Sequence, residues 1–166
     1  MSTEHVVAEF MLNGRPIVVS ENQAEPLSTF LRRAGGCSSI HVGCAEGVCG
    51  ACTVLIDGAS VRSCLSVVGQ VHGSVVTTAE GAGAIPAGKC LQEALIENHA
   101  AQCGYCTCGV LMVGMELVAE STQGELPGES EIRRRLSSVV CRCTGYEAIV
   151  AAIIQALKIT HEMDGK

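Results

Sequence analysis

The sequence predicts the α+β class, with a mixed N-terminal part followed by a helical C-terminal part. The hydrophobic periodicity carries this prediction, because short alternating runs dominate before about residue 80 and helical spacing of apolar residues follows. Between them, residues 81–89 (GAGAIPAGK) are rich in glycine and alanine and contain a proline, which is typical of a connector. We therefore predict two domains, over residues 1–80 and 81–166.

Turn dipeptides organise the first domain. Asn13–Gly14 and Asp57–Gly58 each separate two short apolar runs, as expected of β-hairpins. Pro26 stands at the start of a short helical pattern that ends in two glycines. The expected elements are strands over residues 5–12 and 15–21, a helix over 25–36, two strands within 52–64 and a strand over 74–81.

The second domain is expected to contain four helices. Apolar residues recur at helical spacing in four segments, and a GELPGE break separates the second segment from the third. The helices are expected over residues 90–101, 108–121, 130–140 and 144–159.

Composition narrows the class of function. Aromatic residues make up only 2% of the chain, so the core has to be built from aliphatic side chains. A net charge of −6 argues against nucleic-acid binding, which requires a basic face. The first ten residues lack the pattern of a secretory signal, and no apolar run is long enough for a transmembrane segment. We therefore expect a cytoplasmic location.

Eleven cysteines are the central feature of the composition. In a reducing compartment, an odd number of cysteines fits a disulfide framework poorly. Ligation of a metal ion or a cluster is the favoured interpretation.

The first cysteine set consists of Cys44, Cys49 and Cys52 in C-x4-C-x2-C spacing, with Cys64 beyond the second hairpin. This spacing is typical of a plant-type [2Fe–2S] ferredoxin. The loop is rich in glycines, which permit sharp turns and let backbone N–H groups approach sulfur. The alternative is a structural zinc site, although the step from Cys44 to Cys49 does not match a zinc knuckle.

The second cysteine set combines a C-x2-C pair, Cys103 and Cys106, with a C-x-C pair, Cys141 and Cys143. Each pair precedes or opens an expected helix, where free N–H groups and the helix dipole stabilise thiolates. Two such helix starts could hold a second [2Fe–2S] cluster, with zinc binding or a dithiol relay as alternatives.

The stretches GCAEGVCGACTV, QCGYCT and CRCTGY resemble, in order and spacing, the small iron–sulfur subunit of the xanthine oxidase family of molybdenum hydroxylases. The resemblance spans roughly residues 5–160. It implies a β-grasp plant-type ferredoxin domain followed by a four-helix domain, each holding one [2Fe–2S] cluster. The implied ligands are Cys44, Cys49, Cys52 and Cys64 for the first cluster and Cys103, Cys106, Cys141 and Cys143 for the second.

The resemblance also implies partners. A large subunit would hold the molybdopterin cofactor and oxidise the substrate, and a medium subunit would usually hold FAD, in a dimer of heterotrimers. Gln102 and Cys143 match the positions that contact the pterin in the family. The second cluster would face molybdenum and the first would face FAD. The alternative is a freestanding ferredoxin-like redox or binding module.

Some positions depart from the family pattern or fall outside it. Cys108 stands where the family commonly has proline, and His41 stands where a lysine is frequent. We expect Cys108 to be a buried, inert thiol and do not expect His41 to be a ligand. Cys37 and Cys90 lie outside both sets and are expected to be packing residues.

Overall fold

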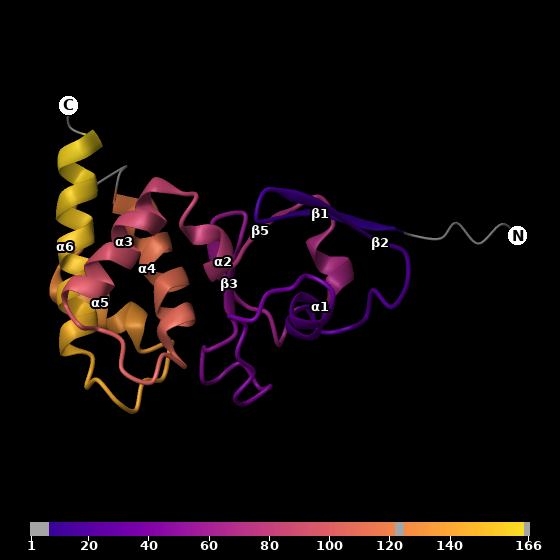
Figure 1. The fold of residues 1–166 in the computed structure, drawn as a ribbon, viewed down its shortest axis with the longest axis horizontal. Coiled ribbons are helices and arrows are strands. Elements are labelled where there is room, and N and C mark those ends of the chain that lie inside the picture. The colour runs from indigo at the N-terminus through magenta and orange to yellow at the C-terminus, as the bar shows by residue number, and fades with distance from the viewer. Residues whose placement is uncertain (1–6, 122–124, 165–166) are drawn as a thin grey trace, which may run out of the picture.

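The computed structural model describes residues 7–121 and 125–164 and shows a sheet-containing half beside a helical half (Figure 1). The first half holds a five-stranded sheet in the order β2-β1-β5-β3-β4. Its elements are β1 (Ala8–Leu12), β2 (Arg15–Val19), α1 (Leu27–Arg33), β3 (Thr53–Ile56), β4 (Ala59–Arg62), the 3₁₀ turn η1 (Val68–Val71) and β5 (Val75–Thr77).

Both predicted hairpins are present. β1 pairs antiparallel with β2 and β3 with β4, through turns in which Asn13, Gly14, Asp57 and Gly58 all have positive φ. β5 joins the two hairpins into one sheet, because it pairs parallel with β1 and antiparallel with β3. The last strand of the half therefore lies at the centre of the sheet.

Alternation along β1 directs one face of the sheet onto α1. Phe10 and Leu12 are buried, and the rings of Phe10 and Phe30 meet edge to face with centroids 6.0 Å apart. Leu27 and Leu31 of α1 are fully buried in the same core. Ile40 and Cys52, from the loop between α1 and β3, are buried in the same core.

The described part of the helical half contains a short helix and four longer ones. They are α2 (Ala79–Ala82), α3 (Pro86–Glu97), α4 (Thr107–Ser121), α5 (Glu129–Leu136) and α6 (Glu147–Asp164). α4 is buried on nearly all sides, and its residues Met112 and Leu117 belong to an aliphatic core with Ile153 of α6. None of the described helices combines the length and apolarity needed to cross a membrane.

Some predicted boundaries are wrong. The strand expected over 74–81 ends at Thr77, and Ala79 begins α2 inside the expected strand and connector. α3 begins at Pro86, four residues before the expected start, because proline suits the first turn of a helix. Residues 5 and 6 of the first expected strand lie outside the described residues.

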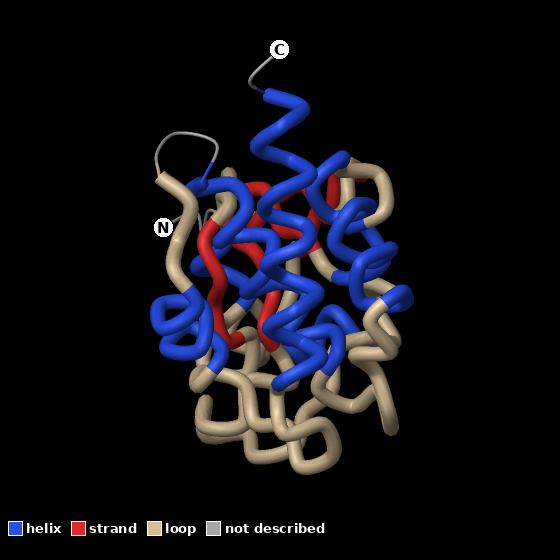
Figure 2. Tube along the Cα trace, turned by 90° about the vertical axis from the view of Figure 1, so that its left-hand side faces the viewer, coloured by secondary structure: helices blue, strands red, loops and turns tan. Residues whose placement is uncertain are grey.

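The two halves pack directly against one another. Leu55 of β3 is buried in the core of the helical half, where α4 lies against β3. On β4, the N–H and hydroxyl of Ser60 donate to the Glu116 carboxylate of α4 at 3.0 and 2.6 Å. Arg135 of α5 pairs with the same carboxylate at 2.7 Å. Loops of both halves gather at one end of the molecule (Figure 2).

Candidate redox centres

The eight predicted ligand positions lie in loops or next to the ends of helices and strands. The loop between α1 and β3 holds Cys44, Cys49 and Cys52, while Cys64 lies two residues after the end of β4. The second set lies in the segments before α4 and before α6. All eleven cysteines of the chain are free thiols.

The first cysteine loop folds back on itself around the Cys44 thiol. Ala45, Gly47 and Gly50 have φ values of 56°, 77° and 73°. The resulting turns aim the N–H groups of Glu46 and Cys49 at Cys44 Sγ, each at 3.4 Å. The N–H of Cys49, followed by that of Glu46, lowers the pKa of Cys44 to about 7, so the loop favours the thiolate.

Cys64 completes this set from the end of the second hairpin. Burial, followed by contact with the Cys52 thiol, raises the pKa of Cys64 to about 11, and Cys44 also acts on it. Ser63 fixes this approach, because its hydroxyl donates to the Cys52 carbonyl oxygen at 2.7 Å. Four thiols therefore converge from a loop and a hairpin, with N–H groups directed at one sulfur, and this donor set fits a [2Fe–2S] cluster.

In the second set, thiols from the segment before α4 lie next to thiols from the segment before α6. Burial, followed by the neighbouring Cys141 thiol, raises the pKa of Cys106 to about 12. Contact with Cys103 raises the pKa of Cys143. Burial opposes ionisation of Cys141, but hydrogen bonds from Thr144 and from the N–H of Cys143 lower its pKa overall. This arrangement of four thiols also fits a [2Fe–2S] cluster.

Tyr146 holds the segment that carries Cys141. It has a φ of 69°, its hydroxyl donates to the Val139 carbonyl oxygen at 2.9 Å, and it accepts from the Cys141 N–H at 2.8 Å. These two hydrogen bonds fix the backbone around Cys141.

The two cysteine sets are in backbone contact. The N–H of Val140 donates to the Cys49 carbonyl oxygen at 2.9 Å. At Gly50 a Cβ would overlap the Ser138 carbonyl oxygen, and at Gly109 of α4 a Cβ would overlap the Gly50 carbonyl oxygen. Glycine at both positions therefore allows the first cysteine loop to lie directly against the helical half.

Two further side chains at this junction were not predicted as site residues. His41 stacks on Tyr105, which lies between Cys103 and Cys106, with ring centroids 4.6 Å apart. The Tyr105 carbonyl oxygen lies 2.8 Å from Nδ1 of His41. The guanidinium group of Arg62 donates to the Gly47 carbonyl oxygen in the first half and to the Ser138 carbonyl oxygen in the helical half. No spacing signal in the sequence marks these contacts, because they join segments far apart in the chain.

The positions predicted to face a molybdenum subunit are accessible. Gln102 and Cys143 are both exposed. Among the described residues, no three His, Cys, Asp or Glu side chains are arranged to hold a single metal ion.

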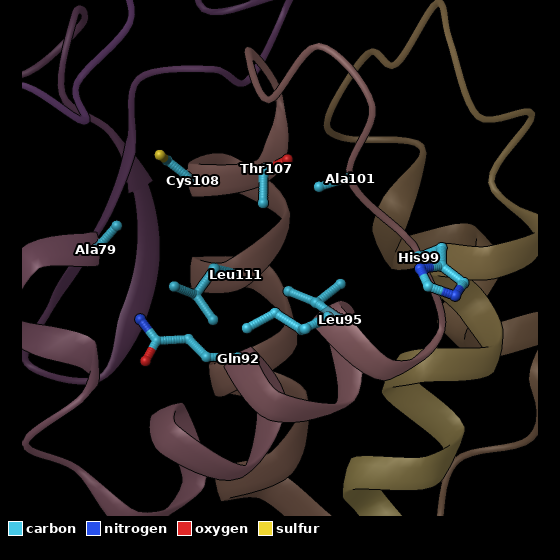
Figure 3. A pocket seen from close by; sticks show the side chains of 9 residues that line it. Ala79, Gln92, Leu95, His99, Ala101, Thr107, Cys108 and Leu111 are labelled. Carbon is cyan, nitrogen blue, oxygen red and sulfur yellow. The ribbon is translucent and has the colours of Figure 1, made fainter.

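The three cysteines outside the sets lie elsewhere in the fold. Cys37 is buried in the first core beside the Thr78 hydroxyl, and Cys90 is half-buried on α3. Cys108 is half-buried and lines an apolar pocket of about 580 Å³ between α2, α3 and α4, together with Leu95 and Leu111 (Figure 3). Burial is the main cause that raises the pKa of Cys108, which favours a protonated thiol.

Each half of the chain matches a known protein family. Residues 10–74 match the family described as a 2Fe-2S iron-sulfur cluster binding domain. Residues 78–154 match the family described as a [2Fe-2S] binding domain. The order of these two domains agrees with the order of the two cysteine sets.

Relatives match more than nine-tenths of the chain. The nicotine 6-hydroxylase small subunit of Paenarthrobacter nicotinovorans is 41% identical over 156 residues, covering 93% of this chain and 91% of the relative. The xanthine dehydrogenase iron-sulfur-binding subunit of Escherichia coli O157:H7 is 36% identical and covers 94% and 97%.

A solved structure agrees with the fold. One chain of quinoline 2-oxidoreductase from Pseudomonas putida 86 superposes with a TM-score of 0.84 at 35% identity, covering 96% of this chain and 98% of that one. Two adjoining [2Fe–2S]-binding domains and full-length similarity to such subunits lead to one conclusion. The chain belongs to the small iron–sulfur subunits of the xanthine dehydrogenase family of molybdenum hydroxylases.

Proposed function

We propose that this chain carries electrons from a molybdopterin centre on a large partner subunit, through two [2Fe–2S] clusters, to FAD or another acceptor on a second partner. Each cluster, when bound, accepts and passes on single electrons. The proposed ligands are Cys44, Cys49, Cys52 and Cys64 for the first cluster and Cys103, Cys106, Cys141 and Cys143 for the second.

The backbone contact between the cysteine sets supports this proposal most directly. Cys49 and Cys141 belong to different sets. The Val140 N–H donates to the Cys49 carbonyl oxygen, and Val140 is the residue directly before Cys141. A chain that only stored or sensed electrons would not require two such centres in contact. A relay does, because electron transfer weakens steeply with distance.

Different residues of the chain have different proposed roles at the two clusters. Backbone N–H groups in the first loop hold negative charge at Cys44, and Thr144 does so at Cys141. Exposed Gln102 and Cys143 are proposed to contact the pterin of the large subunit, which places the second cluster nearest to molybdenum. The first cluster would then face the FAD-binding medium subunit.

The assembly and the location are part of the same proposal. Relatives named as small subunits support a complex with larger chains, proposed here as a dimer of heterotrimers. Eleven cysteines, none of them in a disulfide and eight of them proposed as cluster ligands, suit a reducing compartment, which we propose to be the cytoplasm. Two hydrophobic cores and two matched segments support the proposed division of the chain into two domains. The boundary proposed from the sequence, between residues 80 and 81, falls within α2.

Purification of the tagged chain from its native host tests the proposal. The complex is analysed for subunit masses and for iron, molybdenum and flavin. We expect a larger molybdenum-containing chain to copurify with four irons bound per copy of this chain, the sum of two [2Fe–2S] clusters. A brown protein that arrives alone and without molybdenum would instead support the freestanding ferredoxin-like module.

A further inference from the structure

We propose that Arg62 is a positioning residue that holds the two redox loops in a fixed relation and places an uncompensated positive charge beside the first of them. The proposal rests on the function proposed above, because it assigns Arg62 a role between the two clusters. Arg62 is the last residue of β4, two residues before Cys64, and its side chain is half-buried.

The guanidinium group of Arg62 donates to three separate segments. Its Nε donates to the Gly47 carbonyl oxygen in the first cysteine loop at 3.3 Å. One terminal nitrogen donates to Thr53 Oγ1 at 2.5 Å, and the other donates to the Ser138 carbonyl oxygen. A planar group with donors in fixed directions suits three such acceptors, whereas a lysine ammonium has no fixed fork.

Thr53 extends this contact to a second glycine of the loop. Its hydroxyl donates to the Gly50 carbonyl oxygen at 2.6 Å, and the side chain is buried. Arg62 therefore holds the carbonyl of Gly47 directly and that of Gly50 through Thr53. Both glycines have positive φ, so the anchored carbonyls lie at the turns that shape the cysteine loop.

The contact with Ser138 joins this loop to the second cysteine set. Ser138 lies three residues before Cys141 and its carbonyl oxygen also limits the space at Gly50. Two residues later, the Val140 N–H donates to the Cys49 carbonyl oxygen. Two contacts thus link the segment before Cys141 to the first loop. One is the backbone hydrogen bond from Val140 to Cys49, and the other runs through the Arg62 side chain, which binds both Gly47 and Ser138.

The charge of Arg62 is not neutralised by an ion pair. Its three acceptors are two carbonyl oxygens and a hydroxyl oxygen, and among the described residues no carboxylate pairs with it. Glu116 lines a cavity together with Arg62, but its carboxylate is engaged by Ser60 and Arg135. A positive charge beside a cluster favours its reduced, more negative state and so raises its reduction potential.

Two substitutions separate position from charge. Arg62→Lys keeps the positive charge but cannot reach three acceptors, and Arg62→Gln removes the charge as well. Arg134→Lys and Arg134→Gln are matched controls, because Arg134 lines the same cavity but pairs with Glu131 of its own helix. Each variant is purified as the complete complex and its iron content is measured.

Two spectroscopic readouts follow. Electron paramagnetic resonance of the fully reduced complex reports the magnetic interaction between the two clusters, which depends steeply on their separation and orientation. A redox titration of the same signals gives the potential of each cluster. We expect both Arg62 variants to lose the wild-type interaction, and only Arg62→Gln to shift the first cluster's potential downward. Both Arg134 variants should match the wild type.

Other outcomes overturn the proposal. If both Arg62 variants keep the wild-type magnetic interaction between the clusters and the wild-type reduction potentials, the guanidinium neither positions the clusters nor changes their potentials. If Arg62→Gln does not fold, an unchanged interaction in Arg62→Lys alone would refute the positioning role. Loss of a cluster from Arg62→Lys would make Arg62 an assembly residue instead. Absence of molybdenum from the wild-type complex would contradict the proposed function, while the interaction between clusters would still decide the role of Arg62.

Discussion

Cys64 and Cys143 occupy opposite kinds of environment. Cys64 is half-buried behind the second hairpin, against the Cys52 thiol, whereas Cys143 is exposed next to Cys103. A relay needs both: an internal anchor for one centre and an accessible edge at which the other meets its partner. As proposed ligands, Cys64 and Cys143 would therefore serve two different purposes, because their surroundings differ.

Serine substitution at these two cysteines should have different consequences. We expect Cys143→Ser to damage the second cluster and its coupling to molybdenum, and Cys64→Ser to remove only the first cluster. Electron paramagnetic resonance of the two centres, together with turnover using an external electron acceptor, measures both effects. Full turnover of the Cys143 variant would show that the proposed order of centres is wrong.

Gly50 is a single residue with two constraints, a φ of 73° and no space for a Cβ beside Ser138. Gly58 has a φ of 88° but open space around the Cβ position. We expect Gly58→Ala to cost about 1 kcal/mol of unfolding free energy from backbone strain alone. Gly50→Ala should cost about 3 kcal/mol, because overpacking against backbone adds to that strain.

Urea unfolding of the two alanine variants measures the difference. Equal losses at Gly50 and Gly58 would mean that the contact between the first loop and residues 138–140 contributes nothing to stability.

At the scale of elements, the start of α4 explains why the chain tolerates a cysteine where its family commonly has proline. Cys108 is the second residue of α4, and the first turn of a helix leaves its N–H groups without intrahelical partners. Proline there would remove no helical hydrogen bond. The half-buried Cys108 thiol instead contributes to the wall of the apolar pocket.

Cys108→Pro should therefore leave both clusters in place, with a change in unfolding free energy of less than about 1 kcal/mol. Val113→Pro is the contrasting variant, because a proline in the middle of α4 breaks a hydrogen bond and should cost about 3 kcal/mol or more. Iron content and thermal unfolding of the two variants test this. Loss of the second cluster from Cys108→Pro would assign Cys108 a role at that centre.

The elements themselves were largely predictable. The Asn13–Gly14 and Asp57–Gly58 turns correctly predicted two hairpins, and helical spacing correctly predicted the four longer helices. Ends were less reliable, since residues 79–82 form a helix where a strand and a connector were expected. Helix α2 has only four residues, which is too short for a periodic pattern.

At the scale of the whole molecule, the junction between the halves depends on a carboxylate. Burial alone would raise the pKa of Glu116, but hydrogen bonds from Ser60 and the charge of Arg135 lower it below its ordinary value of 4.5. A carboxyl group with a lowered pKa stabilises the folded state above its unfolded pKa. That contribution disappears as pH falls through the folded value.

The contribution of Glu116 to the unfolding free energy should therefore be steady above about pH 4.5 and decrease below it. Glu116→Gln should be less stable than the wild type at pH 7 and should show a shallower decrease in acid. Glu9→Gln, on the exposed face of β1, is the control and should follow the wild type. Chemical unfolding between pH 7 and pH 3 measures these curves. Identical curves for Glu116→Gln and the wild type would exclude this contribution.

The sequence by itself determined the two-part architecture and the two sets of four candidate ligands. These features are local, because cysteine spacing, glycine turns and apolar periodicity depend on neighbouring residues. Only the tertiary structure decided that β5 lies parallel to β1, that Cys106 faces Cys141, and that Arg62 joins Gly47 to Ser138. Such contacts bring together residues far apart in the chain, and their pairing follows from how the halves pack.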